Sequence, residues 1–117
     1  MKQINYLKSA KRTINLESEA LKKVAKSLNK DFSALCEYLL NSKGRIICLG
    51  VGKSGHIANK TSATLSSTGS PAFFVNAGEA MHGDVGAITK KDSVIIFSHS
   101  CESDEVINLL PTLRNVK

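Results

Sequence analysis

Apolar residues recur at helical spacing over the first part of the chain. In residues 5–29 they fall three or four positions apart, which predicts an amphipathic helix with Ser18 as the one break in its stripe. That stripe consists of Leu7, Ala10, Ile14, Leu21, Ala25 and Leu28. A second helix is predicted to start at Asp31, a residue type that caps helix N-termini, and Gly44 is placed to close it. Its apolar face holds Phe32, Leu35, Cys36, Leu39 and Leu40.

The pattern then changes to short apolar runs of strand length. These runs predict three strands, at residues 45–49, 72–75 and 93–97. Helices are predicted at residues 55–68 and 103–116, and a loop or single turn at residues 78–84. Strands that are almost wholly apolar are typical of a parallel sheet covered on both faces. With right-handed crossovers, the order of elements predicts a three-layer α/β domain.

Three strands are fewer than a doubly wound domain usually contains. The apolar strand at 93–97 would lie at an open edge, and such an edge promotes pairing with another chain. We therefore expect either an N-terminal piece of a longer domain or a partner that covers this edge. We divide the chain into an N-terminal helical segment, residues 1–44, and the first part of an α/β domain, residues 45–117.

The net charge of +6 at first favours a nucleic-acid partner. Its distribution does not, because residues 1–44 hold nine Lys/Arg against four Asp/Glu, whereas residues 45–117 hold seven against six. The excess is spread along the predicted helices and is typical of a solvated face. Since no DNA-reading motif accompanies it, we expect no nucleic-acid partner.

Other features of the composition restrict the class of protein further. The sequence has no apolar run of about 18 residues and its N-terminus lacks the apolar core of a secretory signal, so we expect a cytoplasmic protein with no membrane partner. Its three cysteines form no C-x-x-C pair, which disfavours a zinc site or a disulfide framework. Cys36 and Cys48 lie on apolar patterns and are predicted to be buried.

A glycine loop, Gly50-Val-Gly52-Lys53-Ser54-Gly55, follows the first predicted strand. It is not a Walker A loop, because the position of the first glycine in that motif is Ile47. It fits the spacing of a dinucleotide-binding turn, but the second strand ends in Val75-Asn76-Ala77, without the acid that binds ribose hydroxyls. A tight turn with no ligand remains an alternative.

A smaller phosphate monoester explains the loop better. A helix N-terminus presents N–H groups to an anion, with Ser54 adding a hydroxyl and Lys53 a positive charge. The third strand is followed by a second polar loop, Ser98-His99-Ser100-Cys101-Glu102-Ser103, whose three hydroxyls suit a phosphate group. Two such loops at neighbouring strand ends predict a phosphate site between them.

Three segments resemble the sugar isomerase (SIS) domain family. They are GKSGHIANKTSATLSSTG, FFVNAGEAMHGDVG and the serine loop, and the resemblance runs from about Leu39 to Leu113. The run GEAMHGDVG is most similar to the branch of arabinose 5-phosphate isomerases. The resemblance implies a flavodoxin-like five-stranded domain, of which this chain stops before the last two strands. It also implies a tetramer, and no CBS module follows in this chain.

What the resemblance implies chemically is interconversion of D-ribulose 5-phosphate and D-arabinose 5-phosphate, a step toward the lipopolysaccharide precursor Kdo. The phosphate contacts would fall on Ser54 and on the serine loop, at Ser98, His99, Ser100 and Ser103. The reacting end of the sugar would lie near Lys53, His82 and Glu105. The family takes a further glutamate and histidine from the part that this chain lacks, so we expect the chain alone to be inactive.

Aldose–ketose isomerisation moves a proton between neighbouring carbons through an enediolate, which needs an acid/base group and stabilisation of an oxyanion. His82 and Glu105 are the candidate acid/base groups and Lys53 the candidate stabiliser, with no metal or other cofactor required. The serine loop departs from the family pattern, which has asparagine and glycine where this chain has His99 and Cys101. The alternative function is a non-catalytic phosphosugar-binding module or a fragment of a regulator.

Overall fold

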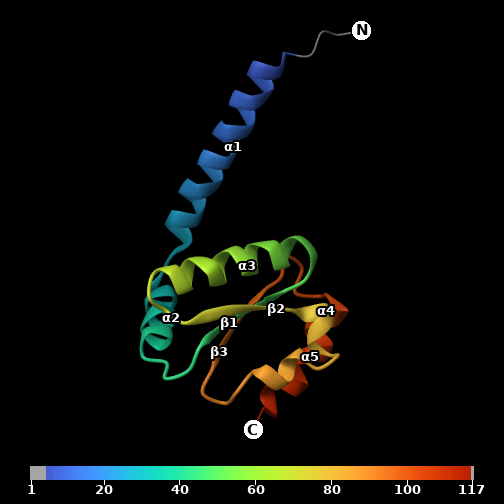
Figure 1. Cartoon of the computed structure of the whole chain (residues 1–117). Coiled ribbons are helices and arrows are strands. Elements are labelled where there is room, and N and C mark those ends of the chain that lie inside the picture. The colour runs from blue at the N-terminus through green and yellow to red at the C-terminus, as the bar shows by residue number, and fades with distance from the viewer. Residues whose placement is uncertain (1–4, 117) are drawn as a thin grey trace. The chain divides into compact units, whose positions relative to one another are not determined.

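The computed structural model describes residues 5–116, and the chain divides into two compact units, Met1–Cys36 and Glu37–Lys117 (Figure 1). Helix α1 (Tyr6–Ser27) lies in the first unit, and helix α2 (Lys30–Leu40) crosses the boundary. Asp31 does not cap α2 as predicted. The helix begins one residue earlier because the side chain of Asn29 accepts a hydrogen bond from the Asp31 N–H at 2.8 Å.

The second unit is built on a three-stranded parallel sheet, as the apolar runs predicted. Its strands are β1 (Ile46–Gly50), β2 (Ala72–Asn76) and β3 (Ser93–Phe97), in the spatial order β2-β1-β3. β1 is central and buried along its whole length. The strands are in register, so Gly50 lies beside Asn76 on one side and Phe97 on the other, and all three carboxyl ends are level.

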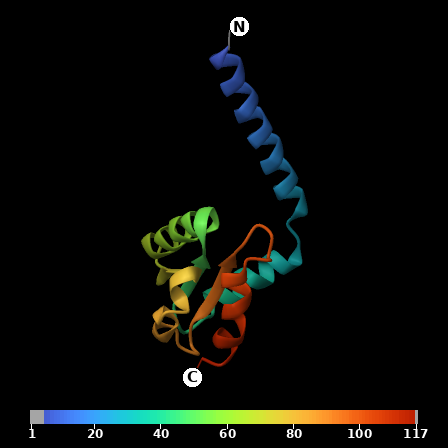
Figure 2. The same cartoon turned by 90° about the vertical axis from the view of Figure 1, so that its right-hand side faces the viewer.

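Helices cover both faces of this sheet, which confirms the three-layer α/β arrangement. Helix α3 (Gly52–Ser67) packs on one face, where Ala58 meets Cys48 of β1. The other face is covered by α4 (Ala77–Ala80), the 3₁₀ turn η1 (Asp84–Ala87) and α5 (Asp104–Arg114). Figure 2 shows α3 and α5 on opposite sides of the strands. The core beneath α5 includes Leu49 and Leu109, both fully buried.

Two local predictions were wrong. Helix α3 starts at Gly52 rather than at residue 55, so the glycine loop is already its first turn. Residues 78–84 hold the end of the single helical turn α4, the turn residues after it and the first residue of η1, as a short turn predicted, and the Asn76 side chain caps α4 by accepting the Gly78 N–H at 2.9 Å. Cys36 is only half-buried, whereas Cys48 is buried as predicted, and burial raises the pKa of its thiol.

Gly44 serves a different purpose from the helix cap that was predicted. Helix α2 ends at Leu40, four residues earlier. A Cβ atom at Gly44 would overlap the backbone of Lys91, which lies against it at the amino end of the sheet. The glycine is therefore required for two backbones to approach closely.

An ion pair between the partly exposed Arg45 and the buried Asp92 joins the amino ends of β1 and β3 beside this contact. The Asp92 side chain is 2% exposed and accepts hydrogen bonds from the Arg45 N–H at 2.7 Å and the Arg45 Nη2 at 2.9 Å. The N–H and hydroxyl of Thr89 donate to the same carboxylate, at 2.8 and 3.0 Å. The hydrogen bonds from Arg45 hold the pKa of Asp92 well below its usual range, although burial acts in the opposite direction.

Candidate functional site

The order in which strands are added to the sheet reverses between β1 and β3. From β1 it passes through α3 to β2 on one side, and it then returns across the other face to β3 on the opposite side of β1. In open parallel sheets, ligands bind outside the carboxyl ends of the strands where the order reverses. The loops after β1 and β3 meet this condition, since the two strands are neighbours with level ends.

The turn after β1 is shaped by its glycines. Gly52 has φ +56°, a left-handed conformation that favours glycine. A Cβ atom at Gly55 would lie 3.2 Å from the Gly50 carbonyl oxygen, so Gly50 and Gly55 allow the helix to start directly against the strand. Tight strand-to-helix packing thus accounts for the glycine spacing that resembles a dinucleotide-binding turn.

The first turn of α3 carries two of the predicted site residues. Lys53 is exposed and Ser54 is half-buried, and both lie among the first three residues of the helix. The preceding Val51 has no side-chain group that caps the helix, so N–H groups of this turn are left for solvent or an anion. The helix dipole places partial positive charge at the same end.

The serine loop after β3 is held by its own hydroxyl groups. Ser98 Oγ accepts the Cys101 N–H at 2.9 Å, and Ser100 Oγ accepts the Glu102 N–H at 3.2 Å. Ser103 precedes α5, and its carbonyl accepts the N–H groups of the first turn, while its side chain makes no capping bond. The loop therefore has ordered hydroxyl groups next to a second helix N-terminus without a side-chain cap.

Cys101 holds the least favourable backbone conformation in this loop. Its φ is 59°, and it is the non-glycine residue with positive φ in the part of the chain that the structure describes. The left-handed region costs an L-residue roughly 1–2 kcal/mol. Cys101 is thus accommodated in this loop with backbone strain.

Replacing Cys101 by glycine is expected to raise the free energy of unfolding by about 0.5–1 kcal/mol, because the strain is relieved while the unfolded chain gains some freedom. Urea unfolding of the two proteins measures the difference. Cys101→Ala is the matched control, since it removes the thiol and keeps the Cβ atom. An equal gain in the alanine variant would show that the thiol, and not the backbone, is responsible.

Side chains from the two loops meet at an open hollow of about 330 Å³. Three predicted phosphate contacts line it, namely Ser54, Ser98 and His99. Its remaining lining residues are apolar and were not predicted: Ile57, Ile96 and Phe97. Ile57 was detectable from the sequence, because it lies one helical turn after Ser54 and therefore on the same face of α3.

The other predicted residues are not gathered in this hollow. Ser100, Ser103 and Lys53 lie in the flanking loops and first helical turn but do not line it. His82 is exposed in the turn between α4 and η1, where its backbone N–H donates to the Glu79 carbonyl at 2.9 Å. Glu105 is exposed in the first turn of α5. Lys53, His82 and Glu105 thus follow three different strands, and none of them lines this hollow.

Larger hollows occur elsewhere, one along α1 and one between η1 and the end of α5. Neither is lined by a predicted site residue, so we assign the candidate site to the smaller hollow at the strand ends.

Within residues 5–116 no group of three or more His, Cys, Asp and Glu residues is arranged to hold a metal ion. The helices described there include none that is long and apolar enough to cross a membrane.

The doubly wound sheet and the polar loops at its switch point define an α/β domain of the class that binds ligands at the carboxyl ends of its strands. A sequence model of the SIS domain matches residues 38–117, and the chain belongs to that family. It is 45% identical over 113 residues to the arabinose 5-phosphate isomerase KdsD of Pseudomonas aeruginosa, covering 97% of this chain and 35% of that protein. The KdsD of Escherichia coli K12 is 41% identical over 112 residues, covering 96% and 34%. The chain thus spans about a third of the length of these curated relatives.

Solved structures show the same fold. The structure of c3406 from Escherichia coli CFT073 in complex with arabinose 5-phosphate has a TM-score of 0.93 at 39% identity, covering 99% of this chain and 62% of that one. A structure from Listeria monocytogenes strain 4b F2365 has a TM-score of 0.90 at 24% identity, covering 96% and 61%, and at that identity the likeness concerns the fold alone. The prediction of an SIS-type domain is confirmed.

Proposed function

We propose that the chain is the phosphosugar-binding part of an aldose–ketose isomerase that interconverts D-ribulose 5-phosphate and D-arabinose 5-phosphate. The observation that carries the proposal is the meeting of Ser54 with Ser98 and His99 at one hollow. Curated isomerases of arabinose 5-phosphate and a structure containing that sugar phosphate support the choice of sugar, because they match nearly the whole chain.

In this proposal the phosphate group sits between the first turn of α3 and the serine loop. The hydroxyls of Ser54, Ser98, Ser100 and Ser103, with His99, donate to its oxygens, and the N–H groups of α3 add the field of the helix dipole. The Cys101 N–H and the Glu102 N–H now bond to hydroxyls within the loop. These two N–H groups can donate to the phosphate only if their hydrogen bonds to Ser98 and Ser100 break.

The reacting end of the sugar extends toward the ends of the other strands. There Lys53 stabilises the oxyanion of the enediolate, while His82 and Glu105 are the acid/base groups that move the proton. No metal or other cofactor takes part.

We also propose that this protein acts in the cytoplasm, in the synthesis of a lipopolysaccharide precursor, and that it forms a homo-oligomer, tetrameric in the whole protein. We also propose that isomerisation needs residues beyond this chain.

Binding of D-arabinose 5-phosphate to the purified chain, measured by titration calorimetry with inorganic phosphate as competitor, tests the proposal. Ser54→Ala and Ser98→Ala should each weaken binding about tenfold or more, since each removes a hydrogen bond to a charged group. Ser67→Ala, at the far end of α3, is the matched control and should leave binding unchanged. Sugar-phosphate binding that is indifferent to the first two substitutions would contradict the site.

A measurement of turnover distinguishes an isomerase from a non-catalytic phosphosugar-binding module. Slow isomerisation by the protein in the form that the cell makes, followed by NMR of the two pentose phosphates, is the expected result. Binding without any turnover in that form would indicate the alternative, a phosphosugar-binding module, and would leave the phosphate site itself in place.

A further inference from the structure

Asn76 joins the end of a strand to the start of a helix. It is the last residue of β2, where it pairs with Gly50 of β1, and it is also the N-cap of α4. Its side chain accepts the Gly78 N–H at 2.9 Å. A Cβ atom at Gly78 would lie 3.3 Å from the same oxygen, so the two residues pack closely around this bond. Asn76 thus fixes the direction in which the chain leaves the sheet.

Helix α4 has only four residues and depends on contacts of this kind. A helix this short is not stable by itself, because nucleation costs more than its few hydrogen bonds return. Besides the Asn76 cap, it is held by Ala77 and Ala80, which are 0% and 1% exposed and lie in the same core cluster as Leu109 of α5. Figure 1 shows α4 beyond the end of β2 and beside α5.

His82 follows this helix after a single residue. Its N–H donates to the Glu79 carbonyl at 2.9 Å, and the Gly83 N–H donates to the Ala80 carbonyl at 3.3 Å. The turn that carries His82 is therefore bonded directly to α4. Because the side chain of His82 is exposed, the backbone of this turn, rather than packing around the imidazole, sets where the imidazole lies.

A direct contact between Asn76 and the sugar is the alternative role for this residue. Asn76 lies at the carboxyl end of β2, level with the ends of the other strands. The bond from the Gly78 N–H orients the amide, so a direct contact would use the Nδ2 group. Loss of a contact that binds the substrate raises KM, whereas loss of a positioning residue lowers kcat.

We propose that Asn76 is a positioning residue for His82, and that it acts by capping α4 and thereby holding the turn that carries the imidazole. The inference rests on the proposed function, because it takes His82 as an acid/base group. Without the cap, α4 and the turn exchange among several conformations. Only a fraction of the molecules then presents the imidazole in the geometry that proton transfer needs.

Asn76→Ala should lower kcat for pentose phosphate isomerisation about tenfold, a population change of the size that loss of an N-cap causes. KM should change less than about twofold. D-Arabinose 5-phosphate binding should be unchanged, because the proposed phosphate contacts follow β1 and β3, and it shows that the variant is folded. The measurement uses the protein in the form that the cell makes. A raised KM with normal kcat would refute the positioning role.

Asn76→Ser is the conservative variant. Serine caps helices about as well as asparagine does, so this variant should keep kcat within about threefold of the wild type. It lacks the amide that a direct contact with the sugar would use. A loss as large as that of Asn76→Ala would therefore indicate the direct contact and rule out positioning through the cap.

A double-mutant cycle shows whether Asn76 acts through His82. In a chain that already carries His82→Ala, the further change Asn76→Ala should lower kcat less than about twofold, because the residue that it positions is gone. An equal loss in both backgrounds would sink the proposal, since the effect would then not depend on His82.

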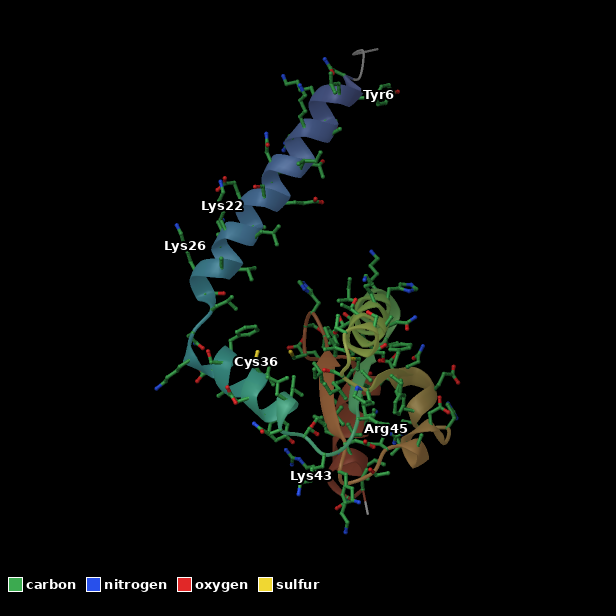
Figure 3. The ribbon with its side chains drawn as sticks, turned by 60° about the vertical axis from the view of Figure 1, so that its left-hand side comes forward. Tyr6, Lys22, Lys26, Cys36, Lys43 and Arg45 are labelled. Atoms are coloured by element: carbon green, nitrogen blue, oxygen red, sulfur yellow. The ribbon has the colours of Figure 1, made fainter. Side chains whose placement is uncertain are left out.

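Asn41→Ala is the matched control for Asn76→Ala. The Asn41 side chain also bonds to a helix end, with Nδ2 donating to the Glu37 carbonyl at 2.8 Å. It lies two residues before Lys43, which Figure 3 labels in the segment that leads into the amino end of β1. Its loss should leave kcat within about twofold, since it is at the other end of the sheet from His82.

Exchange of the His82 amide hydrogen with water, measured by NMR, reports on the same turn without any turnover. Asn76→Ala should speed this exchange about tenfold, and Asn76→Ser and Asn41→Ala less than about threefold. If the wild type isomerises no pentose phosphate, the proposed function fails, and the exchange rate alone decides whether Asn76 holds the turn. Equal exchange in the wild type and Asn76→Ala would show that it does not.

Discussion

Replacing Asp92 by asparagine is expected to lower the free energy of unfolding by about 3 kcal/mol at pH 7, because removing one member of a buried ion pair leaves its partners unsatisfied. The side chain is almost fully buried and accepts bonds from both Arg45 and Thr89. Arg45 is 43% exposed, so water compensates part of its loss and the effect falls at the low end for buried pairs. Urea unfolding followed by circular dichroism measures it.

The stability difference between the wild type and Asp92→Asn should become smaller as the pH is lowered. The pKa of Asp92 is lowered in the folded chain, so its stabilising contribution is complete above the unfolded value of about 3.9 and is lost as the pH falls below it. The difference between the wild type and Asp92→Asn should therefore shrink between about pH 5 and pH 3.

Asp104→Asn serves as the control for Asp92→Asn. It removes the same charge from an exposed position in the first turn of α5, and it should cost less than about 1 kcal/mol. Similar losses in the two variants, or a difference that stays constant with pH, would show that the buried pair contributes little.

Replacing Lys53 by alanine is expected to lower kcat for pentose phosphate isomerisation about 10²–10³-fold, the usual cost of losing one group that stabilises an oxyanion. KM should change much less, because an interaction made mainly in the transition state contributes little to substrate binding. The measurement uses the protein in the form that the cell makes. This expectation depends on the proposed function and on the position of Lys53 in the first turn of α3.

Lys60→Ala provides the matched control for Lys53→Ala. Lys60 is an exposed lysine on the same helix, about two turns further on, and its Nζ donates to Thr64 Oγ1 at 2.8 Å. Its loss should leave kcat within about twofold, because surface substitutions away from a site have small effects. A normal kcat in Lys53→Ala would exclude the role that we give to Lys53, and a raised KM alone would make it a binding residue.

The apolar periodicity of the chain was sufficient to predict the three strands of the second unit and the helices that became α3 and α5. Strands as apolar as 46–49 and 93–97 have one stable arrangement, a sheet covered on both faces, and the structure has it. Boundaries were predicted less well where side chains decide them. Asn29 and Asn76 start helices by accepting N–H groups, a local choice that a hydrophobic pattern does not record.

By itself the sequence determined the fold class, the SIS family and the two loops that hold the candidate site, because these depend on local patterns of apolar, glycine and serine residues. The tertiary structure alone decided which side chains meet. It brought Ser54, Ser98 and His99 to one hollow, whereas Lys53, His82 and Glu105 follow the ends of three strands and do not line it. It also showed Gly44 against Lys91 and Asp92 beneath Arg45. Such contacts join residues more than forty positions apart, and only the packing of the strands sets those distances.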